Sequence, residues 1–318
     1  MRELSLKGEH VSKVTVSVII PTHNRRKLLE IAVQSVFDQT FQDFEIIIIN
    51  DASSDSTNDM LHHLQILDRR INIITNNHSL GGSKSRNLGI AASQGTWIAF
   101  LDDDDKWLPD KLQAQLQALA SHPNAIACSS AYIINYPLQI KKLIYTPSHI
   151  SIDTLLKSNA LGGTSVCICE STILKRIGGF DESLKSSQDW DLWLRLLTCG
   201  EIISIKKPLV HYYVHFNFRI SNNMCAKYSG SRRFYFKHKS AMTNRTRMMN
   251  LSFICFIKSR QKNSFIFYRL RNLLISMKYT DFKLGLTYFV SSFPRIAIML
   301  INNLVSRLYV SSKIKLND

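Results

Sequence analysis

The chain has 318 residues, which is enough for one large domain or two modest ones with a substantial core. Hydrophobic residues make up 45% and charged residues 20%, with only 12 glycines and 7 prolines, so the composition excludes disordered, collagen-like and linker-dominated chains. The net charge of +16 is concentrated at one end: residues 1–218 sum to −1, whereas residues 219–318 sum to +17. We therefore expect two parts, residues 1–218 and residues 219–318, with different roles.

The cysteines and the amino terminus indicate a cytoplasmic chain. The six cysteines form no CxxC pair and no Cys/His zinc spacing, so we expect free thiols in a reducing compartment rather than a disulfide framework. Residues 1–13 are polar and the first apolar run begins at Val14, so we expect no signal peptide.

Five segments rich in β-branched residues are expected to be strands: Val14–Ile20, Phe44–Ile49, Ile71–Thr75, Thr96–Leu101 and Ala125–Ile134. Their nearly continuous apolar runs are typical of parallel strands covered by helices on both faces. Helices are expected at Lys27–Gln39 and Lys111–Ala120, the first with an apolar stripe of Leu28, Ile31, Ala32, Ser35 and Val36. This alternation predicts an α/β fold with right-handed βαβ units, in which ligands bind beyond the carboxyl ends of the strands.

Four consecutive carboxylates, Asp102–Asp105, follow directly on the expected strand that ends at Leu101. Alternation along an extended chain would place Asp102 and Asp104 on one side. Oxygen ligands suit Mg²⁺ or Mn²⁺ rather than zinc or copper, so a metal site is favoured here. A solvated acidic turn is the alternative interpretation.

Two further segments are expected at the same edge of the sheet. Asn50–Asp55 follows the second strand, and a carboxylate there can accept hydrogen bonds from a nucleobase or ribose, although a capped turn explains most of the pattern. Gly81–Gly89 lacks the spacing of a Walker P-loop, but Lys84 and Arg86 near a helix amino terminus favour a phosphate-bearing ligand.

The last candidate in this part is Gly178–Glu182 with the helical run Gln188–Leu196. The tryptophans of the run lie at helical spacing and are expected in the core. Asp189 and Asp191 both stand near the helix start, where capping accounts for one carboxylate and does not require the other.

The basic region, residues 219–318, alternates cations with aromatic and aliphatic residues. Its longest charge-free stretches, Leu284–Pro294 and Ile296–Ser306, are 11 residues each, short of the roughly 20 that a spanning helix needs. Interfacial helices on an anionic membrane are the favoured interpretation. A helical bundle packed on the rest of the chain is compatible with it, and RNA or DNA binding is disfavoured.

Taken together, these segments resemble family 2 glycosyltransferases with the GT-A fold, over about Val14–His215. Val16–Arg25 resembles the opening strand and nucleotide-side turn, which implies that Pro21, Thr22 and Asn24 lie at the donor. Asn50–Asp55 resembles Asp-Asp-Gly-Ser-Thr-Asp, with Asn50 in place of the first Asp, and implies that Asp51 contacts uracil.

The resemblance also implies the remaining roles. Asp102–Asp105 resembles the block with the DxD motif, so Asp104 is the expected direct metal ligand, and Asp102 or Asp103 is expected near the ribose and the metal waters. Gln188-Asp189 resembles the Glu-Asp pair that supplies the catalytic base, so Asp189 inherits that role. His211–His215 resembles a late Tyr-Arg-x-His segment, with Tyr213 where Arg is common, and implies that His215 closes over the diphosphate.

The fold implied is α/β, a mixed and mainly parallel sheet flanked by helices, followed by a basic, mostly helical region. The activity implied is an inverting, Mn²⁺- or Mg²⁺-dependent transfer of a hexose, glucose or galactose first, from a UDP-sugar to an undecaprenyl-diphosphate-linked saccharide. The product would be β-linked and serve bacterial O-antigen or capsule synthesis, with the enzyme peripheral on the cytoplasmic face of the inner membrane. A nucleic-acid-binding protein and a nucleotidyltransferase, which would release pyrophosphate, are the alternatives.

Overall fold

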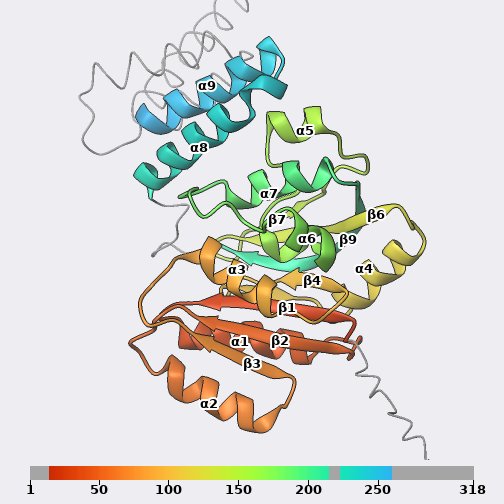
Figure 1. Cartoon of the computed structure of the whole chain (residues 1–318), viewed down its shortest axis with the longest axis vertical. Helices are drawn as coiled ribbons and strands as arrows, with labels where there is room; N and C mark the ends of the chain where they lie inside the picture. The colour runs from red at the N-terminus through yellow and green to blue at the C-terminus, as the bar shows by residue number, and fades with distance from the viewer. Residues whose placement is uncertain (1–13, 215–222, 260–318) are drawn as a thin grey trace, which may run out of the picture. The chain divides into compact units, whose positions relative to one another are not determined.

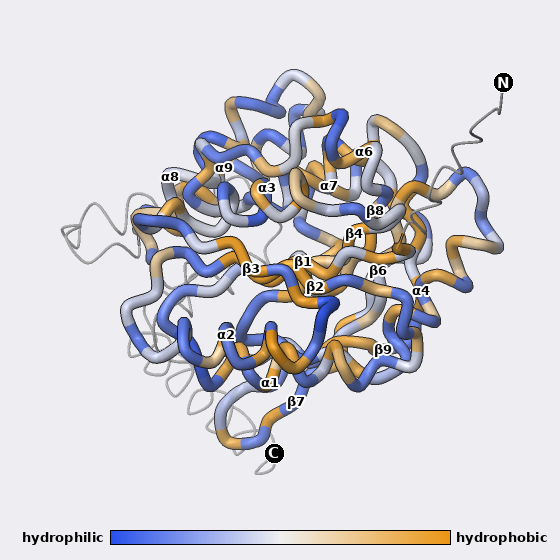
Figure 2. The backbone as a smooth tube through the Cα atoms, turned by 60° about the horizontal axis from the view of Figure 1, so that its bottom comes forward, coloured by the Kyte–Doolittle hydropathy of each residue, from blue (hydrophilic) through white to orange (hydrophobic). Residues whose placement is uncertain are grey.

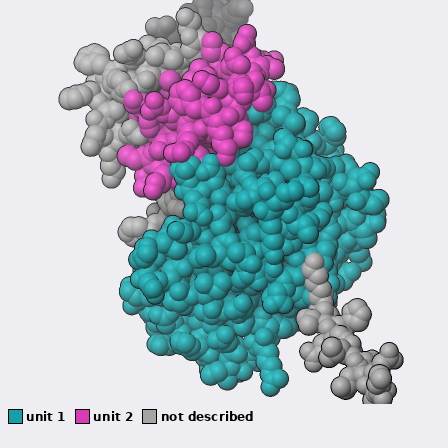
Figure 3. Space-filling view, in the orientation of Figure 1, with its two compact units in different colours: residues 1–183, 188–218 teal, residues 184–187, 219–318 magenta. Residues whose placement is uncertain are grey.

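The computed structural model describes residues 14–214 and 223–259. The chain divides into two compact units, which Figure 3 colours separately. Unit 1 contains residues 1–183 and 188–218, and unit 2 contains residues 184–187 and 219–318. The candidate site belongs to unit 1.

One half of the sheet in unit 1 is parallel. β1 (Val16–Thr22) lies between β2 (Phe44–Asn50) and β4 (Trp97–Phe100), and β3 (Ile71–Thr75) pairs with β2. All three pairings are parallel, and the central strands are almost completely buried. Apolar side chains on both faces of these strands therefore have helices to pack against, as the continuous apolar runs predict.

The other half of the sheet is mixed. β8 (Ile168–Glu170) runs antiparallel between β4 and β6 (Ala125–Asn135), and β9 (Glu201–Tyr213) runs parallel to β6. β5 (Asp105–Trp107) pairs antiparallel with β9, and β7 (Lys141–Ile144) pairs antiparallel with β6. The strand order is β3-β2-β1-β4-β8-β6-β9-β5, so the expected mixed α/β architecture is confirmed.

Helices cover both faces of this sheet (Figures 1 and 2). Figure 2 shows α1 (Arg26–Phe37) and α2 (Thr57–Leu67) on one side and α3 (Gly82–Ala92), α6 (Ser171–Arg176) and α7 (Gln188–Leu197) on the other. α4 (Lys111–Ala120) has the bounds that its sequence pattern predicts, and α5 (Ile152–Lys157) and the short 3₁₀ helix η1 (Thr164–Val166) precede β8.

The buried face of α1 differs from the stripe that the sequence predicts. Ile31 is 50% exposed, and the buried residues of α1 include Leu29 and Val33 instead. The helix faces the sheet with positions 29, 32, 33 and 36, which is the i, i+3, i+4, i+7 pattern shifted from the expected one. Ser35 is buried as expected, and its Oγ accepts a hydrogen bond from the backbone N–H of Trp107 at 3.2 Å.

α3 packs unusually close to the sheet at Gly89. A Cβ atom added there would lie 2.5 Å from Cγ2 of Ile19 on β1 and 2.9 Å from Cδ1 of Ile49 on β2. Glycine lets the helix backbone approach both strands at this point.

In unit 2, the described residues after position 222 form a helical pair. α8 (Met224–His238) and the 3₁₀ helix η3 (Lys239–Ala241) precede α9 (Asn244–Ser259), and Phe234, Ile254 and Ile257 are buried. The Asn223 side chain caps α8 by accepting hydrogen bonds from two backbone N–H groups. Among the described residues, none of the helices combines the length and apolar character that crossing a bilayer requires.

Candidate functional site

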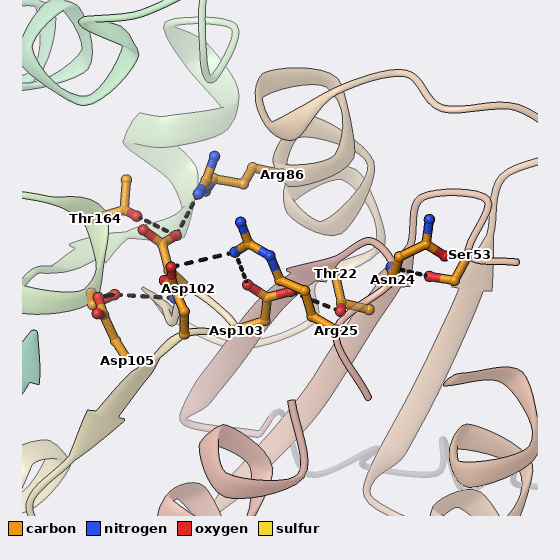
Figure 4. Close-up of polar contacts among 11 residues, drawn as sticks. Thr22, Asn24, Arg25, Ser53, Arg86, Asp102, Asp103, Asp105 and Thr164 are labelled. Carbon is orange, nitrogen blue, oxygen red and sulfur yellow. Dashed lines mark hydrogen bonds and ion pairs between the residues drawn. The ribbon is translucent and has the colours of Figure 1, made fainter. Parts of the chain in front are cut away.

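The candidate site forms where β1, β2 and β4 end. The turn after β1, the turn after β2 and the acidic block Asp102–Asp105 meet at this edge of the sheet (Figure 4). Two hydrogen bonds join the turns: the backbone N–H of Asn24 donates to Ser53 Oγ at 2.9 Å, and Asn24 Oδ1 accepts from the backbone N–H of Ser54 at 2.7 Å. The structure thus brings together the motifs that the sequence places after separate strands.

Three carboxylates of the acidic block converge. Asp102, Asp104 and Asp105 each offer an oxygen, and these atoms lie within 4.8 Å of one another. Ser165 in η1 joins the two ends of the block, because its Oγ accepts from the Asp102 backbone N–H at 3.0 Å and donates to Asp105 Oδ2 at 2.7 Å. Thr164 Oγ1 donates to Asp102 Oδ1 at 3.0 Å. The sequence pattern predicts that Asp102 and Asp104 lie together, and the structure adds Asp105 as a third carboxylate.

This donor set fits a hard divalent cation. All three ligands are carboxylates, the oxygen donors that Mg²⁺ and Mn²⁺ prefer. Asp104 and Asp105 are buried and Asp102 is partly exposed, so the cluster is accessible from one side. A cation among the three would offset the mutual repulsion of their charges.

Asp103 makes separate contacts. Its Oδ2 accepts from Thr22 Oγ1 at 2.9 Å, and its Oδ1 accepts from Arg25 Nη1 at 2.8 Å (Figure 4). Burial raises the pKa of Asp103 to about 6, although the charge of Arg25 opposes this rise. Asp103 therefore ties the acidic block to the end of β1.

Two arginines bring positive charge to the acidic block. Nη1 of Arg25, the residue before α1, lies 3.4 Å from Asp104 Oδ2 in addition to its contact with Asp103. Arg86 on α3 is ion-paired with Asp102, and its side chain is only 11% exposed. Lys84, which the sequence groups with Arg86, is exposed and has no hydrogen bond or ion pair with another described residue.

Arg86 is held by the segment Gly178–Glu182. Its guanidinium lies over the ring of Phe180, 5.5 Å from the centroid, and this ring meets Phe100 edge-on at 5.2 Å. The neighbouring Asn87 accepts from the backbone N–H of Phe180 at 2.8 Å and donates to its carbonyl oxygen at 2.9 Å. The segment Gly178–Glu182 therefore contacts the guanidinium of Arg86 through the ring of Phe180 and is hydrogen-bonded to α3 through Asn87.

The carboxylate of Asp51 is buried and fully engaged at the end of β2. It accepts four hydrogen bonds, from Asn76 Nδ2 at 2.8 Å, the Leu80 N–H at 2.7 Å, Ser79 Oγ at 2.8 Å and the Gly81 N–H at 2.9 Å. Burial alone would raise the pKa of Asp51, but these hydrogen bonds together hold it below its usual value. Asp51 therefore fixes the loop that leads into α3 and to Arg86.

Asp189 stands in the first turn of α7. Its Oδ1 accepts from the Trp190 backbone N–H at 2.8 Å and its Oδ2 accepts from Asn159 Nδ2 at 3.0 Å. Burial raises the pKa of Asp189, the charge of Asp102 adds to that rise, and the charge of Arg86 opposes it. The segment 159–164 links Asp189 to the acidic block, because Asn159 contacts Asp189 and Thr164 contacts Asp102.

The other residues of the run after Gln188 are structural. Asp191 is fully buried and its Oδ2 lies 2.8 Å from Arg195 Nε, while the guanidinium of Arg195 also donates to the carbonyl oxygens of Ile177 and Gly179. Trp190 and Trp193 are buried, as the sequence predicts. The two carboxylates in this helical turn therefore have different partners. Asp191 is ion-paired with Arg195, whereas Asp189 is hydrogen-bonded to Asn159 and to the Trp190 backbone N–H.

Four further residues were predicted from the sequence to lie at or near the site: Pro21, Asn24, Tyr213 and His215. Pro21 is half-buried near the end of β1, and Asn24 adopts the left-handed conformation with φ +53°, which turns the chain into α1. Tyr213 ends β9. His215, expected over the diphosphate, lies outside the described residues.

Sequence reasoning missed several polar residues that organise the site. They are Arg25, Asp105, Asn159, Thr164 and Ser165. Arg25 and Asp105 are the last residues of two recognised motifs, Val16–Arg25 and Asp102–Asp105, but neither was assigned a role from the sequence. The others come from the segment between α5 and β8, whose short polar residues and glycines carry no periodic pattern.

Comparisons of the sequence with known proteins find glycosyltransferases. The sequence profile described as "Glycosyl transferase family 2" matches residues 17–177. An Escherichia coli protein named UDP-Glc:alpha-D-GlcNAc-diphosphoundecaprenol beta-1,3-glucosyltransferase WfgD is 30% identical over 192 residues, which is 60% of this chain and 72% of that protein. WfaP, whose name states the same activity and which is also from Escherichia coli, is 32% identical over 187 residues, 58% of this chain and 71% of that protein.

Solved structures share the fold. Staphylococcus aureus TarS 1-349 in complex with UDP-GlcNAc superposes with a TM-score of 0.58 at 16% identity, covering 87% of this chain and 73% of that one. The mannosyltransferase PcManGT from Pyrobaculum calidifontis, in complex with GDP-Man and Mn²⁺, gives 0.55 at 14% identity, covering 92% of this chain and 79% of that one.

Proposed function

This chain belongs to glycosyltransferase family 2, and on that premise we propose that it transfers a hexose from a UDP-sugar to an undecaprenyl-diphosphate-linked saccharide. Glucose and galactose are the first candidates for the hexose, and the activities named for WfgD and WfaP favour glucose. The product belongs to bacterial surface polysaccharide of the O-antigen or capsule type. The observation that carries the proposal is that one short segment contacts both carboxylates: Asn159 Nδ2 donates to Asp189 Oδ2 at 3.0 Å, and Thr164 Oγ1 donates to Asp102 Oδ1 at 3.0 Å.

The donor occupies the edge formed by β1, β2 and β4. We assign the nucleoside to the side of Pro21, Thr22, Asn24 and Asp51, with Asp102 and Asp103 nearest the ribose. Arg86, which is held by its contacts, and the exposed Lys84 supply positive charge toward the diphosphate, where negative charge grows as UDP leaves. His215 is the further diphosphate contact that the sequence suggests.

The acidic block is the metal site of the proposal. Asp104 and Asp102, with Asp105 beside them, would hold Mn²⁺ or Mg²⁺ through carboxylate oxygens. When bound, such a cation supplies positive charge beside the leaving diphosphate.

Asp189 is the general base of the proposal. One of its carboxylate oxygens takes the proton of the acceptor hydroxyl while that hydroxyl oxygen forms a bond to the anomeric carbon. The bond from the anomeric carbon to the UDP oxygen breaks on the opposite face, and its electron pair leaves with UDP. The configuration inverts, so an α-linked donor gives a β-linked product. The raised pKa of Asp189, due mainly to burial, brings its basicity closer to neutral pH.

The proposal divides the chain into a catalytic domain, residues 1–218, and a basic region, residues 219–318, that attaches the enzyme to the anionic cytoplasmic face of the inner membrane. On α8, the ring of Phe236 is 52% exposed, and Arg232 and Lys239 lie 5.6 and 5.1 Å from its centroid. Residues 223–259 carry eight Lys and Arg and no Asp or Glu. Exposed rings among cations suit a surface where phosphates and acyl chains meet.

The test is UDP release by the purified chain with Mn²⁺, a panel of nucleotide sugars and a lipid-linked GlcNAc-diphosphate acceptor. We expect release with UDP-glucose or UDP-galactose. Asp189→Asn should lower turnover by about 10²- to 10⁴-fold, with UDP affinity nearly unchanged. Asp153→Asn, which alters an exposed carboxylate on α5, serves as the control. Pyrophosphate release from a nucleoside triphosphate, or full turnover by Asp189→Asn, would contradict the proposal.

A further inference from the structure

The loop between α5 and η1 forms one wall beside Asp189. Nδ2 of Asn159 donates both to Asp189 Oδ2 at 3.0 Å and to the carbonyl oxygen of Gly162 at 3.1 Å. The indole N–H of Trp193, a fully buried residue of α7, donates to the same carbonyl oxygen at 3.1 Å. Gly162 is therefore fixed relative to Asp189 through three hydrogen bonds.

An aromatic ring lies against this fixed point. A Cβ atom added at Gly162 would come within 2.9 Å of Cε1 and 3.2 Å of the hydroxyl oxygen of Tyr132 on β6, and Gly162 has φ +88°. Glycine is required there by both the space and the backbone conformation. The ring of Tyr132 meets that of Tyr212 on the paired strand β9 at 63°, with centroids 6.4 Å apart. The two rings support each other as an aromatic pair.

The phenol of Tyr132 lies within electrostatic reach of Asp189. Burial raises the pKa of Tyr132, and the charge of Asp189 raises it further. Tyr132 is nevertheless partly exposed, and no described residue is hydrogen-bonded to its hydroxyl. A partly exposed ring therefore lies against Gly162, in the loop whose Asn159 is hydrogen-bonded to the carboxylate that we assign as base.

We propose that Tyr132, supported by Tyr212, is the platform on which a pyranose ring of the acceptor saccharide stacks, and that the Asn159–Gly162 loop sets the distance between this platform and Asp189. The proposal rests on the proposed function, because it takes Asp189 as the group that faces the acceptor hydroxyl. The C–H groups on one face of a pyranose are weakly positive and suit the negative face of an aromatic ring. The sugar hydroxyls at the ring edge can then reach both the phenol and the base.

The test compares acceptor and donor kinetics in three tyrosine variants. Tyr132→Leu keeps apolar volume without an aromatic face, and we expect it to raise KM for a lipid-linked GlcNAc-diphosphate acceptor about tenfold while KM for the UDP-sugar stays within about twofold. Tyr132→Phe keeps the ring and should stay within about threefold of the unmodified chain. Tyr136→Ala, at an exposed tyrosine four residues along the chain, is the matched control and should change neither constant.

Each outcome separates this proposal from the function on which it rests. If the unmodified chain transfers sugar and Tyr132→Leu leaves the acceptor KM unchanged, the platform is wrong and the function stands. If Tyr132→Leu raises the KM of donor and acceptor alike, or lowers the melting temperature as much as it lowers activity, Tyr132 has only a structural role. If the unmodified chain transfers no sugar, the proposed function fails first.

Discussion

Replacing Asp51 by asparagine probes a buried carboxylate of the site that accepts four hydrogen bonds. The side chain is 5% exposed and accepts two hydrogen bonds on each oxygen. Asparagine keeps one acceptor oxygen and presents an NH₂ group to the other two donors, which lose their partner. A hydrogen bond to a charged group contributes about 1.5–3 kcal/mol, so losing two lowers the free energy of unfolding by about 3 kcal/mol or more.

The assay is thermal unfolding at pH 7, followed by calorimetry. For a domain of this size, 1 kcal/mol corresponds to about 2–4 °C, so we expect Asp51→Asn to lower the melting temperature by about 6–12 °C. Asp153→Asn removes an exposed carboxylate that pairs with Lys157, and this control should change the melting temperature by about 2 °C or less. A shift in Asp51→Asn no larger than in this control would refute the hydrogen-bond reasoning.

The pH dependence gives a second measurement on the same variant. Burial favours the protonated form of Asp51, but the four hydrogen bonds outweigh it and lower the pKa. A lowered pKa in the folded state stabilises the fold above the unfolded-state pKa of about 3.9, and this contribution is lost as the pH falls through the folded-state pKa. The melting temperatures of the unmodified chain and Asp51→Asn should therefore converge on acidification.

Three further predictions follow from other contacts. Arg25→Gln removes a cation 3.4 Å from Asp104 and should tighten Mn²⁺ binding at least tenfold by calorimetric titration; equal or weaker binding would contradict this. Burial raises the pKa of Asp103 to about 6, so the folded state binds its proton more tightly and stability falls as the pH rises from about 4 to about 6; Asp103→Asn should flatten that fall in melting temperature. Phe236→Ala should weaken binding to phosphatidylglycerol vesicles several-fold, whereas Ile66→Ala, at a residue 82% exposed, should not; equal effects would argue against a membrane contact on α8.

The parallel half of the fold was predictable because its strands are long and apolar on both faces. All five expected strands and all three expected helical segments are present, with ends displaced by up to two residues. β5 and β8 were missed because each has three residues, too few for a period to show, and β7 begins with two lysines. The predicted apolar stripe on α1 was wrong at Ile31, because an apolar residue was assumed to be buried and Ile31 is 50% exposed.

At the site, the sequence shows which residues carry charged or polar groups, but it does not show which side chains are hydrogen-bonded to one another. The acidic block was visible as four adjacent aspartates, but its division into a converging triad and a separate Asp103 depends on the turn between β4 and β5. The contact between Asn159 and Asp189 joins residues 30 apart and has no local signature. Lys111 reads as an ordinary helix cation but is fully buried over the ring of Trp107, 4.0 Å from its centroid.

The close approach of α3 to the sheet has a consequence for how this enzyme can be altered. Arg86 lies one helical turn before Gly89, where an added Cβ atom would come within 2.5 Å of Ile19 and 2.9 Å of Ile49. Any larger residue at position 89 would lift the helix and carry the guanidinium away from the carboxylate it neutralises. The position of the Arg86 guanidinium therefore depends on the packing of Gly89 against the hydrophobic core, away from the acidic block itself.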